Sequence, residues 1–308
     1  LQHRSYLRLT EQPFVSLPAD VLAQTIISLV ALIYGATHVA GAFQHIKSDP
    51  LVRTRDKDNY QAILTMPKAN RPELIALLAF NIEVAMVREK INPQRGDTSG
   101  LYRLQFWRDA INSIYGESTA PVPRQPVAVA LCAFAPKASL SLLDSLVVAR
   151  QQSIGDRPYS TVDDLSAYGK STEGALVCLQ AESLARECAV MKPSEEVVKA
   201  ANELGAAYGI MNLIRSSLPL MARGIVLLPT DLLALHNLTA DKVYNRKNPE
   251  AVAALVKDLT QVNFAVLFQS CFSNDFLALG RTFFSDRVHF FFLHFVYVFI
   301  PFYVPVFC

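Results

Sequence analysis

The sequence predicts an all-α fold. Along residues 53–283 the alternating pattern of a β-strand is almost absent, whereas apolar residues recur at helical spacing in long stretches. Proline and glycine separate these stretches. We expect helices over nine ranges: 55–65, 71–90, 101–116, 125–135, 138–152, 161–190, 194–218, 231–236 and 249–279.

Capping signals mark the starts of two of these helices. Ser160 or Thr161 precedes Asp163 and Asp164, and a cap followed by acids suits the positive end of a helix dipole. The paired carboxylates are therefore interpreted as capping groups rather than as acid–base catalysts. Thr230 is predicted to cap the following short helix in the same way.

Composition restricts the class of protein. With 308 residues and 51% hydrophobic content, the chain can bury the core of one large domain. The 29 basic and 27 acidic residues give a formal net charge of +2, which argues against a nucleic-acid binder that relies on a basic field. The five cysteines are scattered and indicate reduced thiols rather than a metal site. No glycine-rich phosphate loop is present.

The single tryptophan lies in the helix predicted over 101–116. Trp107 follows Phe106 there and shares the helix with Leu101 and Leu104. We interpret it as a core residue, with an aromatic wall of a groove as the alternative.

Both ends of the chain differ from its middle. Residues 1–52 are treated as an N-terminal extension whose stretch 21–43 is uncharged, and is either a membrane span, a buried or interfacial segment, or a wrongly predicted exon. Arg4 and Arg8 fit the remnant of a presequence. Residues 284–308 form an apolar aromatic tail, either an artefact of gene prediction or a membrane segment. In either case the helical domain at 53–283 is expected to be truncated at its C-terminal end.

Two stretches resemble the squalene/phytoene synthase family. In residues 58–89 the matching places are Tyr60, Met66-Pro67, Arg71 and Ala79-Phe80. In residues 205–229 they are Asn212, Arg215, Arg223-Gly224 and Leu228-Pro229. The resemblance implies an isoprenoid-synthase-type helical domain. It also implies residual contacts to a diphosphate or another anion, from Tyr60, Arg71, Asn212, Arg215 and Arg223.

The positions that carry aspartates in active members of this family differ in this chain. The first set reads Ala85, Met86 and Glu89, and the second reads Ser216 and Leu220, so one carboxylate remains of five. Residues four apart share one face of a helix. Carboxylates there would hold the Mg²⁺ ions that neutralise a departing pyrophosphate. We therefore predict no catalytic residue, no metal site and no cofactor, and hence a pseudoenzyme.

Three states of the old cavity stay open at this point. The cavity is filled by side chains or free of ligand, or it retains an isoprenoid or lipid ligand, or the protein is still a Mg²⁺-dependent transferase that condenses prenyl diphosphates.

Three further stretches, 79–87, 101–116 and 124–131, resemble a mitochondrial branch of the family that lacks the aspartates. That branch serves the assembly of respiratory complex I, the NADH:ubiquinone oxidoreductase. The resemblance implies complex I subunits or assembly intermediates as partners, and no nucleic acid. It also implies a mitochondrial location on the matrix side of the inner membrane, with peripheral association.

Overall fold

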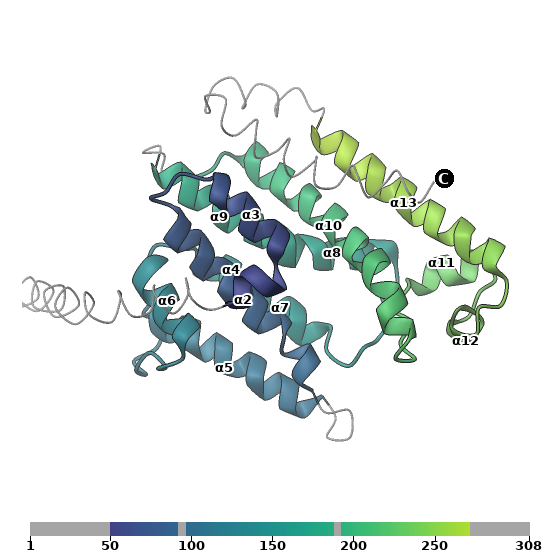
Figure 1. Cartoon of the computed structure of the whole chain (residues 1–308), viewed down its shortest axis with the longest axis horizontal. Coiled ribbons are helices and arrows are strands. Elements are labelled where there is room, and N and C mark those ends of the chain that lie inside the picture. The colour runs from purple at the N-terminus through teal and green to yellow at the C-terminus, as the bar shows by residue number, and fades with distance from the viewer. Residues whose placement is uncertain (1–49, 92–96, 188–191, 272–308) are drawn as a thin grey trace, which may run out of the picture.

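The computed structural model describes residues 50–91, 97–187 and 192–271. Within these ranges every regular element is a helix, so the predicted all-α class is confirmed (Figure 1). No helix of the described ranges is long and apolar enough to cross a membrane. The uncharged stretch at 21–43 and the tail at 284–308 lie outside the described residues.

The helices follow one another with short connections. The first part of the chain holds α2 (Pro50–Arg55), α3 (Lys57–Thr65), α4 (Arg71–Ala85), a 3₁₀ turn η1 (Arg88–Lys90), α5 (Thr98–Ile114), α6 (Pro126–Phe134) and α7 (Leu140–Gln152). The second part holds α8 (Val162–Gly169), a π-helical turn η3 (Lys170–Gly174), α9 (Ala175–Glu187), α10 (Glu195–Met221), α11 (Thr230–Leu235), α12 (Ala240–Tyr244) and α13 (Pro249–Cys271).

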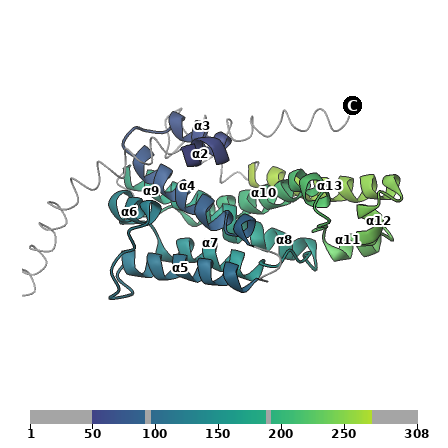
Figure 2. The ribbon, with the colours of Figure 1, turned by 60° about the horizontal axis from the view of Figure 1, so that its bottom comes forward.

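Helix α4 is the central element of the first part. Ten of its 15 residues are buried, on all sides of the helix, so it must be surrounded by other elements. It contacts α2, α3, α6, α7 and α9. In Figure 2, α2 and α3 lie on one side of α4, and α5 lies on the other side. Val52 of α2 is buried in this core, so the folded region includes residues that we assigned to the N-terminal extension.

Helix α10 is the central element of the second part and contacts α8, η3, α9 and α13. Glycines allow an unusually close approach at this crossing. A Cβ atom added at Gly205 would lie 2.2 Å from the backbone nitrogen of Gly174 and 2.8 Å from the carbonyl oxygen of Gly169. The backbones of α10 and of the α8–η3 segment therefore touch directly, which fixes the position of η3.

Buried apolar side chains form two clusters. The larger one joins residues of α2 to α7 and of α9. The smaller one joins Leu165 of α8 to residues of α10, α11, α12 and α13. The candidate site described below has wall residues from both clusters, Leu104 from the first and Leu213 from the second.

Several predicted helix ranges differ from the structure, including 101–116, where α5 spans Thr98–Ile114. The range 55–65 misses α2, because Asp56 breaks the helix and caps α3 by accepting a hydrogen bond from the Asn59 backbone N–H. The range 71–90 ends at Ala85, and η1 follows after a turn. The range 161–190 is interrupted by η3. The range 194–218 continues to Met221 with Pro219 inside the last turn of α10.

The short helix α12 was not predicted. It has only five residues, and its start is stabilised by the Thr239 hydroxyl oxygen, which accepts from the Lys242 backbone N–H. Helices this short carry little periodicity, so pattern reasoning does not find them. Of the range predicted over 249–279, the structure describes α13 up to Cys271.

The capping prediction at Thr161 is confirmed. Its side chain accepts from the Asp164 N–H, and the Asp164 carboxylate accepts from the Thr161 N–H, which is a complete capping box. The prediction at Thr230 is wrong, because Pro229 occupies the cap position. The Thr230 hydroxyl instead donates to the Ser160 carbonyl oxygen at 2.9 Å and ties α11 to the start of α8.

Candidate functional site

A cavity of about 710 Å³ lies between the C-terminal ends of α4 and α7 and the middle of α10. Helix α8 and the π-helical turn η3 complete its wall. One part of the lining is apolar and includes Val84, Leu104, Ile154, Leu165, Leu213 and Leu227. The other part is polar and includes Arg55, Arg88, Glu89, Arg150, Glu173, Asn212 and Arg215. The cavity is open, so side chains do not fill it.

Five of the site residues singled out in the sequence line this cavity: Ala85, Glu89, Asn212, Arg215 and Ser216. The two degenerate motifs, more than 120 residues apart in sequence, thus meet at one cavity. The other positions of these motifs point elsewhere. Met86 packs against the larger core cluster and Leu220 against the smaller one.

Three residues predicted as residual anion contacts are not part of the cavity wall. Tyr60 packs against the larger apolar cluster. The Arg71 Nε donates to the Met66 carbonyl oxygen at 2.8 Å and closes the turn before α4. Arg223 lies exposed in the turn after α10. Of the residues predicted to contact an anion, only Asn212 and Arg215 are left at the cavity.

The charged side chains that follow the end of α4 form ion pairs. The Glu89 carboxylate accepts from Arg55 Nη1 at 3.2 Å, and about half of each side chain is exposed. Arg88 forms an ion pair with Asp156, in the loop after α7. The Ser216 hydroxyl, on the opposite wall, donates to the Leu213 carbonyl oxygen of its own helix at 3.1 Å. The Glu89 carboxylate therefore has a cationic partner within the chain.

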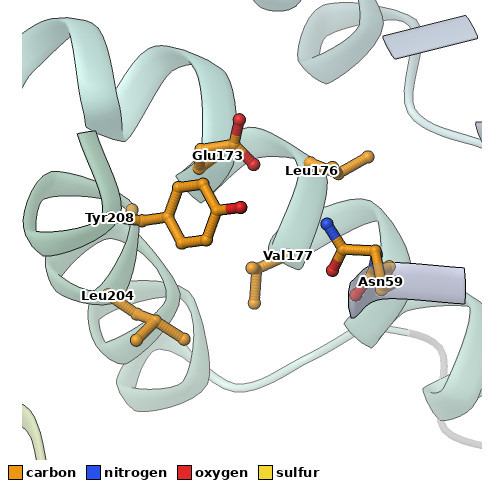
Figure 3. Close-up of a pocket in the computed structure, with 8 residues that line it drawn as sticks. Asn59, Glu173, Leu176, Val177, Leu204 and Tyr208 are labelled. Atoms are coloured by element: carbon orange, nitrogen blue, oxygen red, sulfur yellow. The ribbon is translucent and has the colours of Figure 1, made fainter. Parts of the chain in front are cut away.

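Glu173 is a cavity residue that sequence reasoning missed. Glu173 belongs to the turn η3 and lines two cavities, the main one and a small pocket of about 10 Å³. Tyr208 of α10 and Asn59 of α3 line that small pocket together with Glu173 (Figure 3). A pocket of this size holds roughly one water molecule. The sequence signal was present, since Glu173 is an acid within a run of small and apolar residues, STEGALV.

Burial governs the protonation of this group. It raises the pKa of Glu173 to about 7, while Arg150 acts in the lowering direction and Asp56 in the raising direction. Burial also raises the pKa of the Tyr208 hydroxyl, and the negative charges of Glu173 and Asp56 add to that increase. Near neutral pH, Glu173 is thus partly protonated and can donate as well as accept a hydrogen bond.

Arg150 of α7 is the second cavity residue that sequence reasoning missed. Its side chain is almost completely buried, yet it lines the cavity. Its Nη2 donates to the Asn81 side-chain oxygen at 2.6 Å, and its Nη1 donates to the Leu146 carbonyl oxygen at 2.8 Å. In sequence it looks like an ordinary basic residue at the end of a helix, so nothing marked it as buried.

The sequence model of the squalene/phytoene synthase family matches residues 52–269. The chain therefore belongs to the squalene/phytoene synthase family. Its fold is similar to a crystal structure of a dehydrosqualene synthase in complex with ligand, with a TM-score of 0.61 and 14% sequence identity. That match covers 86% of this chain and 99% of the synthase chain. The predicted isoprenoid-synthase-type fold is thereby confirmed.

Within the family, a similar curated relative is the human NADH dehydrogenase (ubiquinone) complex I, assembly factor 6. The two are 29% identical over 211 residues, which cover 68% of this chain and 60% of the human protein. The chain thus spans less than two thirds of that relative's length. A separate, short similarity of 39% identity over 57 residues links 18% of the chain to 43% of the ER membrane protein complex subunit 5 of Xenopus tropicalis.

The donor groups of the cavity do not fit the Mg²⁺ cluster that family chemistry would need. Mg²⁺ requires hard oxygen ligands in a nearly octahedral arrangement. Among the described lining residues, the carboxylates are Glu89, which is paired with Arg55, and Glu173, whose pKa is raised to about 7. No group of three or more histidine, cysteine, aspartate or glutamate residues in the described ranges could hold a metal ion. We therefore derive no catalytic step through Mg²⁺.

Proposed function

We propose that this chain is a non-catalytic factor in the assembly of respiratory complex I, a pseudoenzyme of the squalene/phytoene synthase family. The observation that carries the proposal is the cavity wall. By the resemblance to the family, Ala85 and Ser216 take the places of metal ligands in this wall, and the Glu89 carboxylate pairs with Arg55. A wall of this kind cannot neutralise a departing pyrophosphate through Mg²⁺.

Similarity to the complex I assembly factor supports the biological part of the proposal. The sequence model of the family matches the chain from residue 52 to residue 269. We propose complex I subunits or assembly intermediates as the partners, and the matrix side of the mitochondrial inner membrane as the location. Peripheral association is the form we propose for contact with that membrane. We also propose that residues 53–283 act as one helical domain.

The proposed function predicts that Glu89→Gln, introduced into the chromosomal gene of the source organism, has only a small effect on the amount of assembled complex I. Disrupting the gene should abolish or strongly reduce assembled complex I. The Glu89→Gln variant should keep assembled complex I within about twofold of the wild-type level, since the lost ion pair with Arg55 is exposed and contributes about 1 kcal/mol or less. The measurement is the amount of complex I on native gels, together with its NADH:ubiquinone oxidoreductase activity.

Glu83→Gln is the matched control for that experiment. Glu83 belongs to the same helix and pairs with Lys90 at 3.6 Å, but it is not part of the cavity wall. Suppose that Glu89→Gln abolishes assembled complex I although the variant protein is present at its normal level, and that Glu83→Gln does not. The Glu89 carboxylate would then have a role in the cavity, against our proposal. Intact complex I after gene disruption would refute the assembly role itself.

A further inference from the structure

Three basic residues are exposed on and just after the short helix α12. They are Lys242, Arg246 and Lys247, and no ion pair within residues 50–91, 97–187 and 192–271 includes any of them. Both ribbon views place α11 and α12 side by side at one end of the fold (Figure 1, Figure 2). Three cations within six residues form a positive patch that attracts an extended negative surface.

The acidic side chains of this region are bonded to other groups or lie at a helix start. The Asp241 carboxylate accepts from the Asn245 side chain at 2.8 Å, and that of Asp231 accepts from a backbone N–H of α8 at 3.2 Å. Asp258 contacts a histidine ring at 2.9 Å. Glu250 lies in the first turn of α13, where a negative charge is favourable. The three cations therefore have no carboxylate partner in the described part of the chain.

Two large hydrophobic side chains are exposed in the same two helices. Leu235 ends α11 and is 68% exposed, and Tyr244 ends α12 and is 51% exposed. Lys242 connects the helices, since its Nζ donates to the Asn237 carbonyl oxygen in the turn after α11 at 3.0 Å. Exposed leucine and aromatic side chains together with lysine and arginine are typical of surfaces that lie in the headgroup region of a bilayer, where tyrosine is enriched.

The turns on both sides of α12 have an uncommon backbone conformation. Asn237, Arg246 and Asn248 have φ angles of 52°, 53° and 61°, and they are three of the four non-glycine residues with positive φ in the described ranges. Asparagine tolerates this conformation, whereas arginine rarely adopts it. The Lys247 N–H donates to the Lys242 carbonyl oxygen at 2.8 Å and holds the second turn in place. An exposed arginine kept in a strained conformation indicates a role for its side chain outside the fold.

We propose that the α11–α12 surface, defined by Leu235, Lys242, Tyr244, Arg246 and Lys247, docks onto a lipid bilayer that carries anionic headgroups. Lysine is depleted at protein interfaces, so two lysines in so small a surface favour a membrane over a protein partner. This inference rests on the peripheral membrane association proposed above, and it names the surface and the lipid chemistry that would produce that association.

The test measures binding of the purified full chain to sedimented vesicles. One set is phosphatidylcholine alone, and the other is two parts phosphatidylcholine to one part phosphatidylglycerol. Each basic residue next to an anionic membrane contributes a factor of about five in affinity. We therefore expect the wild-type chain to bind the anionic vesicles at least ten times as tightly as the neutral ones. Added salt should weaken this preference, because it screens the charges.

Variants test whether the α11–α12 surface is responsible. The combined variant Lys242→Gln, Arg246→Gln and Lys247→Gln should lose at least tenfold in affinity for the anionic vesicles and keep its affinity for the neutral ones. Circular dichroism checks that the variant is folded.

Two control variants match these changes. Arg53, Lys57 and Lys68 are also exposed and belong to no ion pair of the described ranges, but they lie on α2, on α3 and after α3. Their combined replacement by glutamine should leave wild-type affinity. Tyr244→Ser should weaken binding to the anionic vesicles several-fold, whereas Tyr102→Ser, on the exposed side of α5, should not.

Three results would overturn the proposal. The first is equal binding of the wild-type chain to both kinds of vesicle. The second is a combined variant of the surface that binds anionic vesicles like the wild type, or no more weakly than the combined control. The third is a combined variant that lowers assembled complex I in cells but binds vesicles normally, which would assign the surface to a protein partner. None of these results removes the assembly role, because gene disruption tests that role separately.

Discussion

Replacing Trp107 with alanine is expected to lower the free energy of unfolding by about 3–5 kcal/mol. The residue is 4% exposed, and its indole ring packs edge-on against Phe80 of α4 with ring centroids 5.5 Å apart. Phe106 contacts the same indole at 5.4 Å. Truncation would remove this contact between α4 and α5 and leave a void that these rigid neighbours cannot fill. Urea unfolding followed by circular dichroism measures the effect, because the variant has no tryptophan left for fluorescence.

Tyr102→Ala is the control for that variant. Tyr102 belongs to the same helix α5, but 74% of it is exposed, so its truncation should change the free energy of unfolding by about 0.5 kcal/mol or less. Equal stability of the Trp107→Ala and wild-type proteins would show that the packing of α4 against α5 is not as described, and would leave Trp107 open to partner contact.

The second large effect is expected at Gly205. An alanine Cβ there would lie 2.2 Å from the nitrogen and 2.4 Å from the Cα of Gly174, both of them rigid backbone atoms. The π-helical turn and α10 would have to separate, and the wall that carries Glu173 would move with them. We expect Gly205→Ala to lower the free energy of unfolding by about 3 kcal/mol, the upper end of typical overpacking effects.

The sign of this result separates packing from helix propensity. Alanine is favoured over glycine inside a helix by about 1 kcal/mol, so propensity alone would make Gly205→Ala more stable than the wild type. Gly174→Ala is the graded control, since its nearest contacts are 3.2 Å away and the expected loss is smaller. A stabilised Gly205→Ala protein in thermal unfolding would contradict the close crossing of these helices.

The parts of the fold that the sequence predicted are those with strong local signals. Apolar residues recurring at helical spacing predicted the helices, and the pattern around Thr161 predicted a cap that the structure contains in full. The burial of Trp107 was also predicted correctly. The interruption at η3 was not predictable from periodicity, because it comes from the contact of Gly169 and Gly174 with a helix about 30 residues further along the chain.

The candidate site was predicted in part for the same reason. Family motifs located Ala85, Glu89 and Ser216, and the structure places all three at one cavity. Arg150 and Glu173 belong to no such motif. Their importance arises from burial, which depends on the packing of helices distant in sequence and cannot be read from residue type alone.

The proposed function requires that the cavity does not support metal-dependent prenyl chemistry. The most direct test is a calorimetric titration of the full chain with farnesyl diphosphate, with and without Mg²⁺, and product analysis on the same samples. We expect no condensed product, and any binding should be the same whether or not Mg²⁺ is present. Binding that requires Mg²⁺ and is accompanied by turnover would show instead that the chain is an active synthase.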